Sequence, residues 1–143
     1  MKKFTFSLEK ILGIRQFQQE QAELELGRAL SVREGIAKKM SLLARQHVSA
    51  VGQTVGTTDL GILSNAQHYF RFLDMQKEQL LGELAQADIT VEQKRLALQK
   101  AMQKCSSITK LREKQYERYC HEENIEEEKL TDDIVTSRFR NGM

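Results

Sequence analysis

Two long stripes of apolar residues run along the chain with the spacing of a coiled coil. Between residues 8 and 50, positions separated by alternating steps of four and three are apolar at nine of thirteen places. The second stripe, from Leu73 to Ile108, is apolar at nine of eleven positions. This pattern predicts two long α-helices that pack along their stripes. The first stripe is Leu8, Leu12, Arg15, Gln19, Ala22, Leu26, Ala29, Arg33, Ile36, Met40, Leu43, His47 and Ala50, and the second is Leu73, Lys77, Leu80, Leu84, Ala87, Val91, Lys94, Leu98, Ala101, Cys105 and Ile108.

A segment rich in Gly, Thr and Asn, VGQTVGTTDLGILSN, separates the two stripes and interrupts their helical periodicity. We therefore expect a first helix over about 8–50, a loop over about 51–66 and a second helix over about 67–139. If the chain folds back about the middle of this loop, near residue 58, Leu8 lies opposite residue 108 or 109. The two helices would then be antiparallel neighbours.

The second stripe stops after Ile108, although the helical composition continues. The same register then reads Arg112, Gln115, Tyr119, Glu122, Glu126, Lys129 and Asp133, with one apolar position in seven. Residues 109–139 contain no Gly or Pro and consist mostly of good helix formers. We predict that 109–139 is an extension of the second helix with no partner in the chain.

These patterns predict an all-α fold: an elongated two-helix antiparallel coiled coil with a longer C-terminal helix, in a single domain over 1–143. The absence of proline and tryptophan, with only eight glycines, agrees with long helices. Pairing of the same stripes between two chains is the structural alternative.

The net charge of +2 hides blocks of alternating sign along the sequence. The balance is +4 over residues 1–50, −3 over 51–89, +5 over 90–118 and −4 over 119–143. A nucleic-acid partner would require one sustained basic face. Alternating blocks favour protein partners, and we expect no nucleic acid to bind.

Candidate chemistry is sparse. Cys105 and Cys120 are separated by roughly 22 Å if they lie on one helix, which is too far for a disulfide, so we expect reduced thiols and a cytoplasmic location. No stretch is long and apolar enough to span a membrane, and we expect no membrane insertion. His47, His68 and His121 are scattered along the sequence. We predict no metal, no cofactor and no enzymatic activity.

Several large apolar residues fall outside the stripes and are candidates for protein binding. Ile14, Phe17 and Leu24 form a second stripe on the first helix. Tyr69, Phe70 and Phe72 cluster where the second helix leaves the loop. The alternative to partner binding is that these three rings fold under the loop and close the end of the hairpin. Further apolar residues lie on the extension: Leu111, Tyr116, Tyr119, Ile125, Leu130, Ile134 and Phe139.

Both ends of the sequence carry motifs of a known family. The stretch FTFSLEKILGIRQFQQEQAELELGRAL has an aromatic-x-aromatic pair, Leu-Glu-Lys-Ile-Leu, and an Arg one turn later. Near the other end, LREKQYERYCHEENIEEEKLTDDIVTSRF has a Leu, basic residues, Tyr, spaced Glu, two Asp and a closing Arg with Phe. Together these stretches, about two-fifths of the chain, resemble the flagellar FliJ family.

The resemblance implies a component of the flagellar type III export apparatus, similar to the coiled-coil stalk of rotary ATPases. Such a protein is expected to lie in the bacterial cytoplasm, at the cytoplasmic face of the inner membrane. It is also expected to be a monomer in isolation. It is expected to sit in the hexameric export ATPase, to promote the assembly and activity of this ATPase, to connect it to the cytoplasmic domain of the membrane export gate protein, and to recycle export chaperones.

The resemblance also assigns roles to the unused apolar residues. The ATPase ring would contact Ile14, Phe17, Leu111, Tyr116, Tyr119, Leu130, Ile134, Arg138 and Phe139. The export gate would contact Tyr69, Phe70 and Phe72. Two other functions remain open at this point: the equivalent stalk of a virulence-type type III secretion system, and a generic dimeric coiled-coil scaffold or chaperone.

Overall fold

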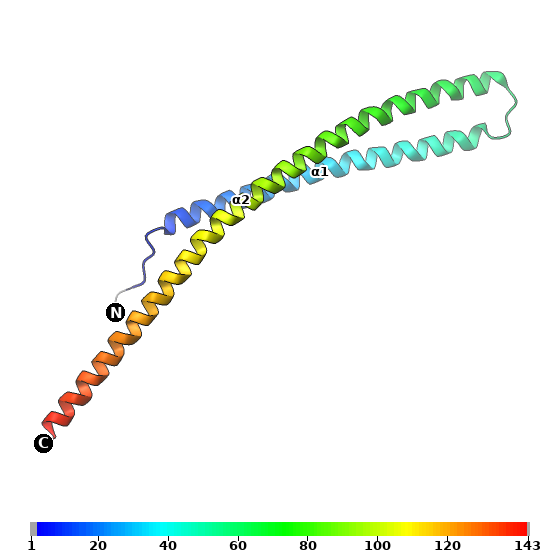
Figure 1. The fold of residues 1–143 in the computed structure, drawn as a ribbon. Coiled ribbons are helices and arrows are strands. Elements are labelled where there is room, and N and C mark those ends of the chain that lie inside the picture. The colour runs from blue at the N-terminus through cyan, green and yellow to red at the C-terminus, as the bar shows by residue number, and fades with distance from the viewer. Residues whose placement is uncertain (1–2, 143) are drawn as a thin grey trace. The chain divides into compact units, whose positions relative to one another are not determined.

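The computed structural model describes residues 3–142, which form two α-helices and no strand. Helix α1 spans Glu9–Thr54 and helix α2 spans Leu60–Asn141. The helices run antiparallel and pack against each other (Figure 1), which confirms the predicted all-α two-helix coiled coil. Their contacts fall into two compact units, one formed by residues 20–99 and the other by residues 3–19 with 100–142.

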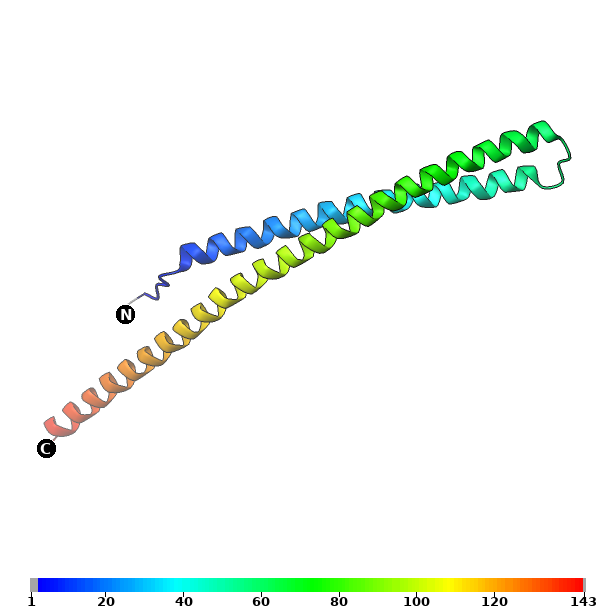
Figure 2. The same ribbon diagram turned by 45° about the horizontal axis from the view of Figure 1, so that its top comes forward.

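The predicted stripes are the contact surfaces of the helices. Eleven of the thirteen positions of the first stripe and ten of the eleven positions of the second are buried or half-buried. In the unit of residues 20–99, Leu73 is the most buried side chain, with 2% of its surface exposed. Ala29, Ala87 and Val91 are buried in the same unit. Figure 2 shows the two helices of this unit side by side in a second orientation.

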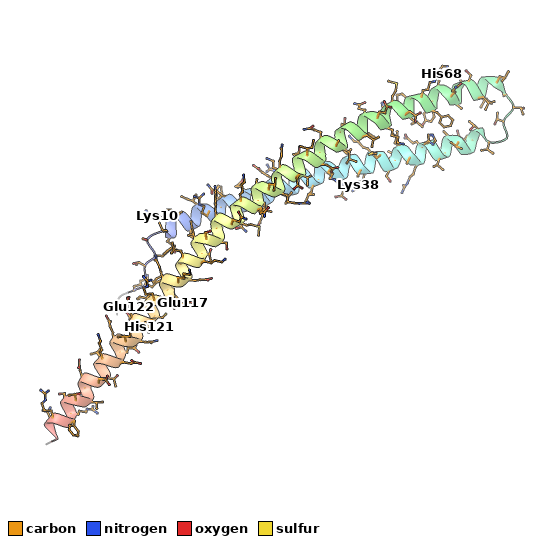
Figure 3. The ribbon with its side chains drawn as sticks, viewed as in Figure 1. Lys10, Lys38, His68, Glu117, His121 and Glu122 are labelled. Carbon is orange, nitrogen blue, oxygen red and sulfur yellow. The ribbon has the colours of Figure 1, made fainter. Side chains whose placement is uncertain are left out.

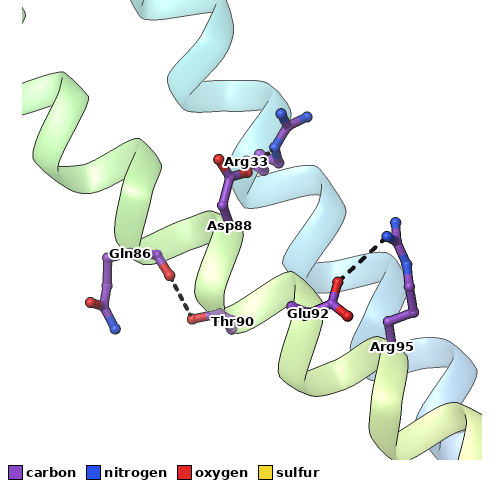
Figure 4. Close-up of polar contacts among 6 residues, drawn as sticks. All are labelled: Arg33, Gln86, Asp88, Thr90, Glu92 and Arg95. Carbon is purple, nitrogen blue, oxygen red and sulfur yellow. Dashed lines mark hydrogen bonds and ion pairs between the residues drawn. The ribbon is translucent and has the colours of Figure 1, made fainter.

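Polar residues in and beside the stripes form ion pairs across the two helices of this unit. Arg33, one of the two exposed positions of the first stripe, pairs with Asp88 (Figure 4). Lys94 Nζ lies 3.0 Å from Glu25 Oε2. Exposed pairs of this kind contribute about 0–1 kcal/mol each. These pairs favour this alignment of the helices more than they add to the stability of the fold. Lys38 and His68 point away from the contact between the helices and are exposed to solvent (Figure 3).

The connection between the helices is shorter than the predicted loop over 51–66, because it occupies only residues 55–59. Gly56 has a φ of 81°, the left-handed conformation that commonly follows a helix C-terminus. Asp59 then caps α2, since its Oδ1 accepts a hydrogen bond of 2.9 Å from the backbone N–H of Gly61. These two local signals end one helix and begin the next within a few residues, so the lapse in periodicity did not mark a long loop.

A pair of glycine substitutions tests this account of the turn. Gly35 lies inside α1, where an added Cβ would meet no atom within 4 Å, so Gly35→Ala should stabilise the chain by about 0.5–1 kcal/mol. Gly56→Ala should destabilise it by about 1 kcal/mol because alanine resists positive φ. Urea unfolding followed by circular dichroism measures both changes. Equal effects of the two substitutions would contradict the turn geometry.

Candidate docking surfaces

Residues 3–8, here called the strap, precede α1 and lie against α2. The ring of Phe4 packs edge-on to Tyr116 at 5.2 Å between centroids and is tilted against Tyr119 at 5.4 Å. The guanidinium carbon of Arg112 lies 5.8 Å from the centre of the Phe4 ring. Arg112 Nε also lies 3.0 Å from Glu9 Oε2 at the start of α1. The strap is therefore attached to α2 by aromatic and cation–π contacts, and the ion pair of Glu9 holds the start of α1 beside them.

These contacts correct the predicted start of the unpaired extension at residue 109. Glu9 meets Arg112, about one helical turn farther along α2 than the predicted opposition of Leu8 to 108 or 109. Beyond Ile108 the stripe positions Arg112, Gln115 and Tyr119 are still half-buried. The loss of apolar residues from the stripe did not end the packing, because aromatic rings and a long arginine side chain replace the aliphatic contacts. From Asn124 to Gly142, by contrast, every residue is exposed.

A groove of about 550 Å³ lies between the strap and α2. We call it the acidic groove because Glu122, Glu123 and Glu126 contribute three carboxylates to it; Figure 3 labels Glu122 on this part of α2. Phe4 and Tyr119 supply aromatic walls. The complete lining is Lys3, Phe4, Thr5, Gln115, Arg118, Tyr119, Glu122, Glu123 and Glu126. A negatively charged site with aromatic walls suits a positively charged side chain.

The strap and its surroundings change the ionisation of two tyrosines. Interaction with the Cys120 thiol raises the pKa of Tyr116 above its ordinary value of 10.0. Loss of water around its ring raises the pKa of Tyr119, with a further contribution from the carboxylate of Glu123. The folded chain therefore holds these phenolic protons more tightly than the unfolded chain does. This contribution to stability is complete below pH 10 and is lost as the pH rises above 10 through the folded-state pKa values.

Ultraviolet titration of tyrosine tests this prediction. In a Tyr69→Phe background, the folded chain should ionise its tyrosines at higher pH than the urea-unfolded chain does. Adding Phe4→Ala should lower the folded midpoint, because water regains access to Tyr119. Phe72→Ala, which removes an aromatic ring near the turn, serves as the control. A folded midpoint at or below the unfolded one would contradict the packing of the strap.

The last part of α2 presents an apolar surface, here called the extension face. Leu130 and Phe139 expose 61% and 69% of their surfaces, and Ile134 and Val135 lie between them in the sequence. At 100° per residue these four side chains occupy one half of the helix circumference. They share this half with the polar residues Glu127, Glu128, Thr131 and Arg138. The other half is polar and contains Glu126, Lys129, Asp132, Asp133, Thr136, Ser137 and Arg140. An exposed amphipathic helix of this kind is suited to docking in a groove of a partner.

The other predicted ring-binding residues are also accessible. Ile14 and Phe17 are exposed on α1, and Leu111 is partly exposed on α2. Tyr116 is exposed as well, although its ring contacts Phe4. Tyr119 is the exception, because it is half-buried beside Phe4. The sequence signal for this contact was the aromatic-x-aromatic pair Phe4 and Phe6, which no apolar stripe included.

The aromatic cluster near the turn is divided between packing and exposure. The ring of Phe70 lies 5.0 Å from that of His47 on α1, so Phe70 contributes to the contact between the helices. Phe72 exposes 54% of its surface, and Tyr69 is also exposed. The assignment of these residues to the export gate stays a prediction, and Phe72 and Tyr69 are the two members most available to a partner.

The described residues include two free cysteines, no cluster of metal-binding side chains and no candidate membrane-spanning segment. Within residues 3–142 no group of three or more His, Cys, Asp or Glu side chains is arranged to hold a metal ion. Cys105 is buried, Cys120 is half-buried, and both are free thiols. Over the same residues, neither helix has a segment that is sufficiently long and apolar to cross a membrane.

Comparison with known proteins identifies the family. The family described as "Flagellar FliJ protein" matches residues 4–143, almost the whole chain. The chain belongs to the flagellar FliJ family. No curated protein and no solved structure matches it significantly. FliJ membership supports a role related to flagellar export. The match includes the middle of the chain, for which the sequence motifs offered nothing specific.

Proposed function

We propose that this FliJ-family chain is the central stalk of the hexameric flagellar export ATPase. In this role it acts in the bacterial cytoplasm without chemistry of its own, promotes assembly and hydrolysis by the ATPase ring, connects the ring to the cytoplasmic domain of the export gate protein, and recycles export chaperones. The observation that carries the proposal is the extension face, an exposed apolar surface on residues 124–142 of α2 in a chain whose family is flagellar.

The exposed side chains suit a stalk that exchanges contacts with successive ATPase subunits. Ile14 and Phe17 on α1, together with the extension face on α2, supply the apolar contacts from which affinity would come. Charged residues around these side chains would form exposed pairs with the ring, each contributing at most about 1 kcal/mol. Contacts of this kind allow binding to a ring without permanent attachment to one subunit.

Mixing the chain with its cognate export ATPase tests the proposal. We expect a complex in light scattering, a shift of the ATPase towards the hexamer, and faster ATP hydrolysis. Sedimentation of the chain alone should give a monomer, whereas a stable parallel dimer would favour a generic coiled-coil scaffold. Absence of both a complex and a change in hydrolysis would exclude the stalk role.

The gate contact has a separate test. Immobilised cytoplasmic domain of the export gate protein should retain the wild-type chain and should retain less of the Phe72→Ala variant. Leu63→Ala, at another exposed apolar residue near the turn, is the matched control. Equal retention of all three chains would remove Phe72 from the gate-binding surface.

A further inference from the structure

The strap occupies a surface of α2 that α1 reaches only with its first residue, since Glu9 pairs with Arg112. Arg112, Gln115 and Tyr119 continue the stripe that packs against α1 earlier in α2, and all three are half-buried. Gln115 and Tyr119 lie beside strap residues that are not helical, because α1 begins only at Glu9. These stripe positions are spaced for contact with a helix. The strap covers them only in part, since Tyr116 and Leu111 beside them stay exposed.

The strap places a cation next to an aromatic ring. Phe4 meets Tyr116 and Tyr119, while the neighbouring Lys3 lines the acidic groove with Glu122, Glu123 and Glu126. On α2 the lining of this groove has three carboxylates and one guanidinium, that of Arg118, so it carries an excess of negative charge. The surface under the strap is thus complementary to a basic residue followed by an aromatic one.

We propose that the acidic groove and the Tyr116–Tyr119 pair form a docking site for a helix of the export ATPase that carries a basic residue beside an aromatic one. In the free chain, Lys3 and Phe4 occupy this site as an internal substitute for that helix, and the partner displaces them when it binds. This inference rests on the proposed function, since it assumes that the ATPase is the partner.

The contacts that hold the strap suit it for displacement. No backbone hydrogen bond joins residues 3–5 to α2, so the attachment depends on side chains. Each aromatic or cation–π contact changes an equilibrium by roughly two- to tenfold. Phe6 is buried, and its carbonyl oxygen accepts a hydrogen bond of 3.2 Å from the backbone N–H of Glu9, which ties it to the start of α1. The strap can therefore leave the groove at Lys3 and Phe4 while Phe6 stays in place.

The partner can bind only those chains in which the strap has left the site. Its apparent affinity is therefore the affinity for the open site multiplied by the fraction of chains in which the site is open. If the strap is docked in about nine chains of ten, the ATPase binds about tenfold more weakly than it would to an open site. Phe4→Ala should therefore tighten ATPase binding by up to about tenfold. Tyr119→Ala should weaken it, because this change removes a wall of the site itself.

Crosslinking follows the strap directly in the full-length chain. A carbodiimide joins lysine amines to nearby carboxylates without a spacer, and mass spectrometry of the free chain should find Lys3 joined to Glu122, Glu123 or Glu126. A saturating concentration of the ATPase should suppress this crosslink. Persistence of the crosslink in the complex would overturn the inference.

Binding measurements with variants provide the second test. Phe4→Ala and Lys3→Glu should both tighten binding of the ATPase, and Met75→Ala, at an exposed residue of the other unit, should leave it unchanged. Lys3→Glu serves as the independent variant if Phe4→Ala loses helicity. Unchanged or weaker binding by Lys3→Glu would overturn the inference. If the wild-type chain binds no ATPase, the proposed function fails and this inference fails with it, whereas binding with the strap still docked refutes only the inference.

Discussion

Leu73→Ala should destabilise the folded chain by about 2–4 kcal/mol. Leu73 exposes 2% of its surface, and it lies in the unit of residues 20–99, where two helices have few other buried side chains. Removing its branched end leaves a cavity that neighbouring helical positions can fill only in part. Urea unfolding followed by circular dichroism measures the loss as a lower midpoint.

Leu81→Ala is the matched control for this prediction. Leu81 lies on the same helix and carries the same side chain, but 45% of its surface is exposed. Its truncation should cost about 1 kcal/mol, less than that of Leu73, since nearly half of its surface is exposed in the folded chain. Equal destabilisation by the two substitutions would show that the stripe through Leu73 is not the main contact between α1 and α2.

A double change on the extension face should separate binding from stability. Leu130→Ser with Ile134→Ser removes two exposed apolar side chains, so the unfolding midpoint should stay almost unchanged. Binding to the export ATPase should weaken by at least about tenfold, because apolar anchors at the centre of an interface contribute most of its affinity. Calorimetric titration against the ATPase, with thermal unfolding in parallel, measures both effects.

Thr136→Ala is the control on the opposite side of the same helical segment. It should alter neither binding nor the unfolding midpoint by more than a small amount. A lower unfolding midpoint in the Leu130 and Ile134 variant would mean that the extension face packs within the chain. Unimpaired ATPase binding would remove this face from the ring-binding surface.

The stripes were predictable from the sequence because their physical basis is repetitive. Leu73, Ala87, Val91 and Cys105 fall on one side of a helix at alternating steps of four and three, and all four are buried. No single position has to be interpreted correctly for such a pattern to emerge. The antiparallel pairing followed because a short glycine-containing connection leaves neighbouring helices no other simple arrangement.

The strap was not predictable in the same way. Its contacts join Phe4 to Tyr116 and Tyr119, more than 100 residues away in the sequence, and no periodicity relates them. Arg112 interrupts the apolar stripe, yet its guanidinium lies over the Phe4 ring and pairs with Glu9. A sequence pattern records Arg112 as a polar break, whereas the structure uses both its charge and its position above an aromatic ring.

The turn illustrates a second limit. Gly52 and Gly61 suggested a long loop, but both residues are helical in the structure. The ends of helices near a turn are contacted by few other side chains, so these residues need not be apolar. The helical backbone hydrogen bonds therefore continue for several residues beyond the end of the apolar pattern. The boundaries were instead set by the positive φ of Gly56 and the carboxylate of Asp59. Local capping chemistry was therefore more informative than composition.

The solvent exposure of residues 124–142 has a consequence for the timing of backbone motion. Every residue of this stretch of α2 is exposed, so cooperative continuation from the preceding turns is the main factor that keeps it helical. Amide hydrogen exchange should become steadily faster from Asn124 towards Gly142, in contrast to the slow exchange expected around Leu73. A partner that lies along the extension face would abolish this gradient, and its affinity would include the free energy needed to suppress the fraying.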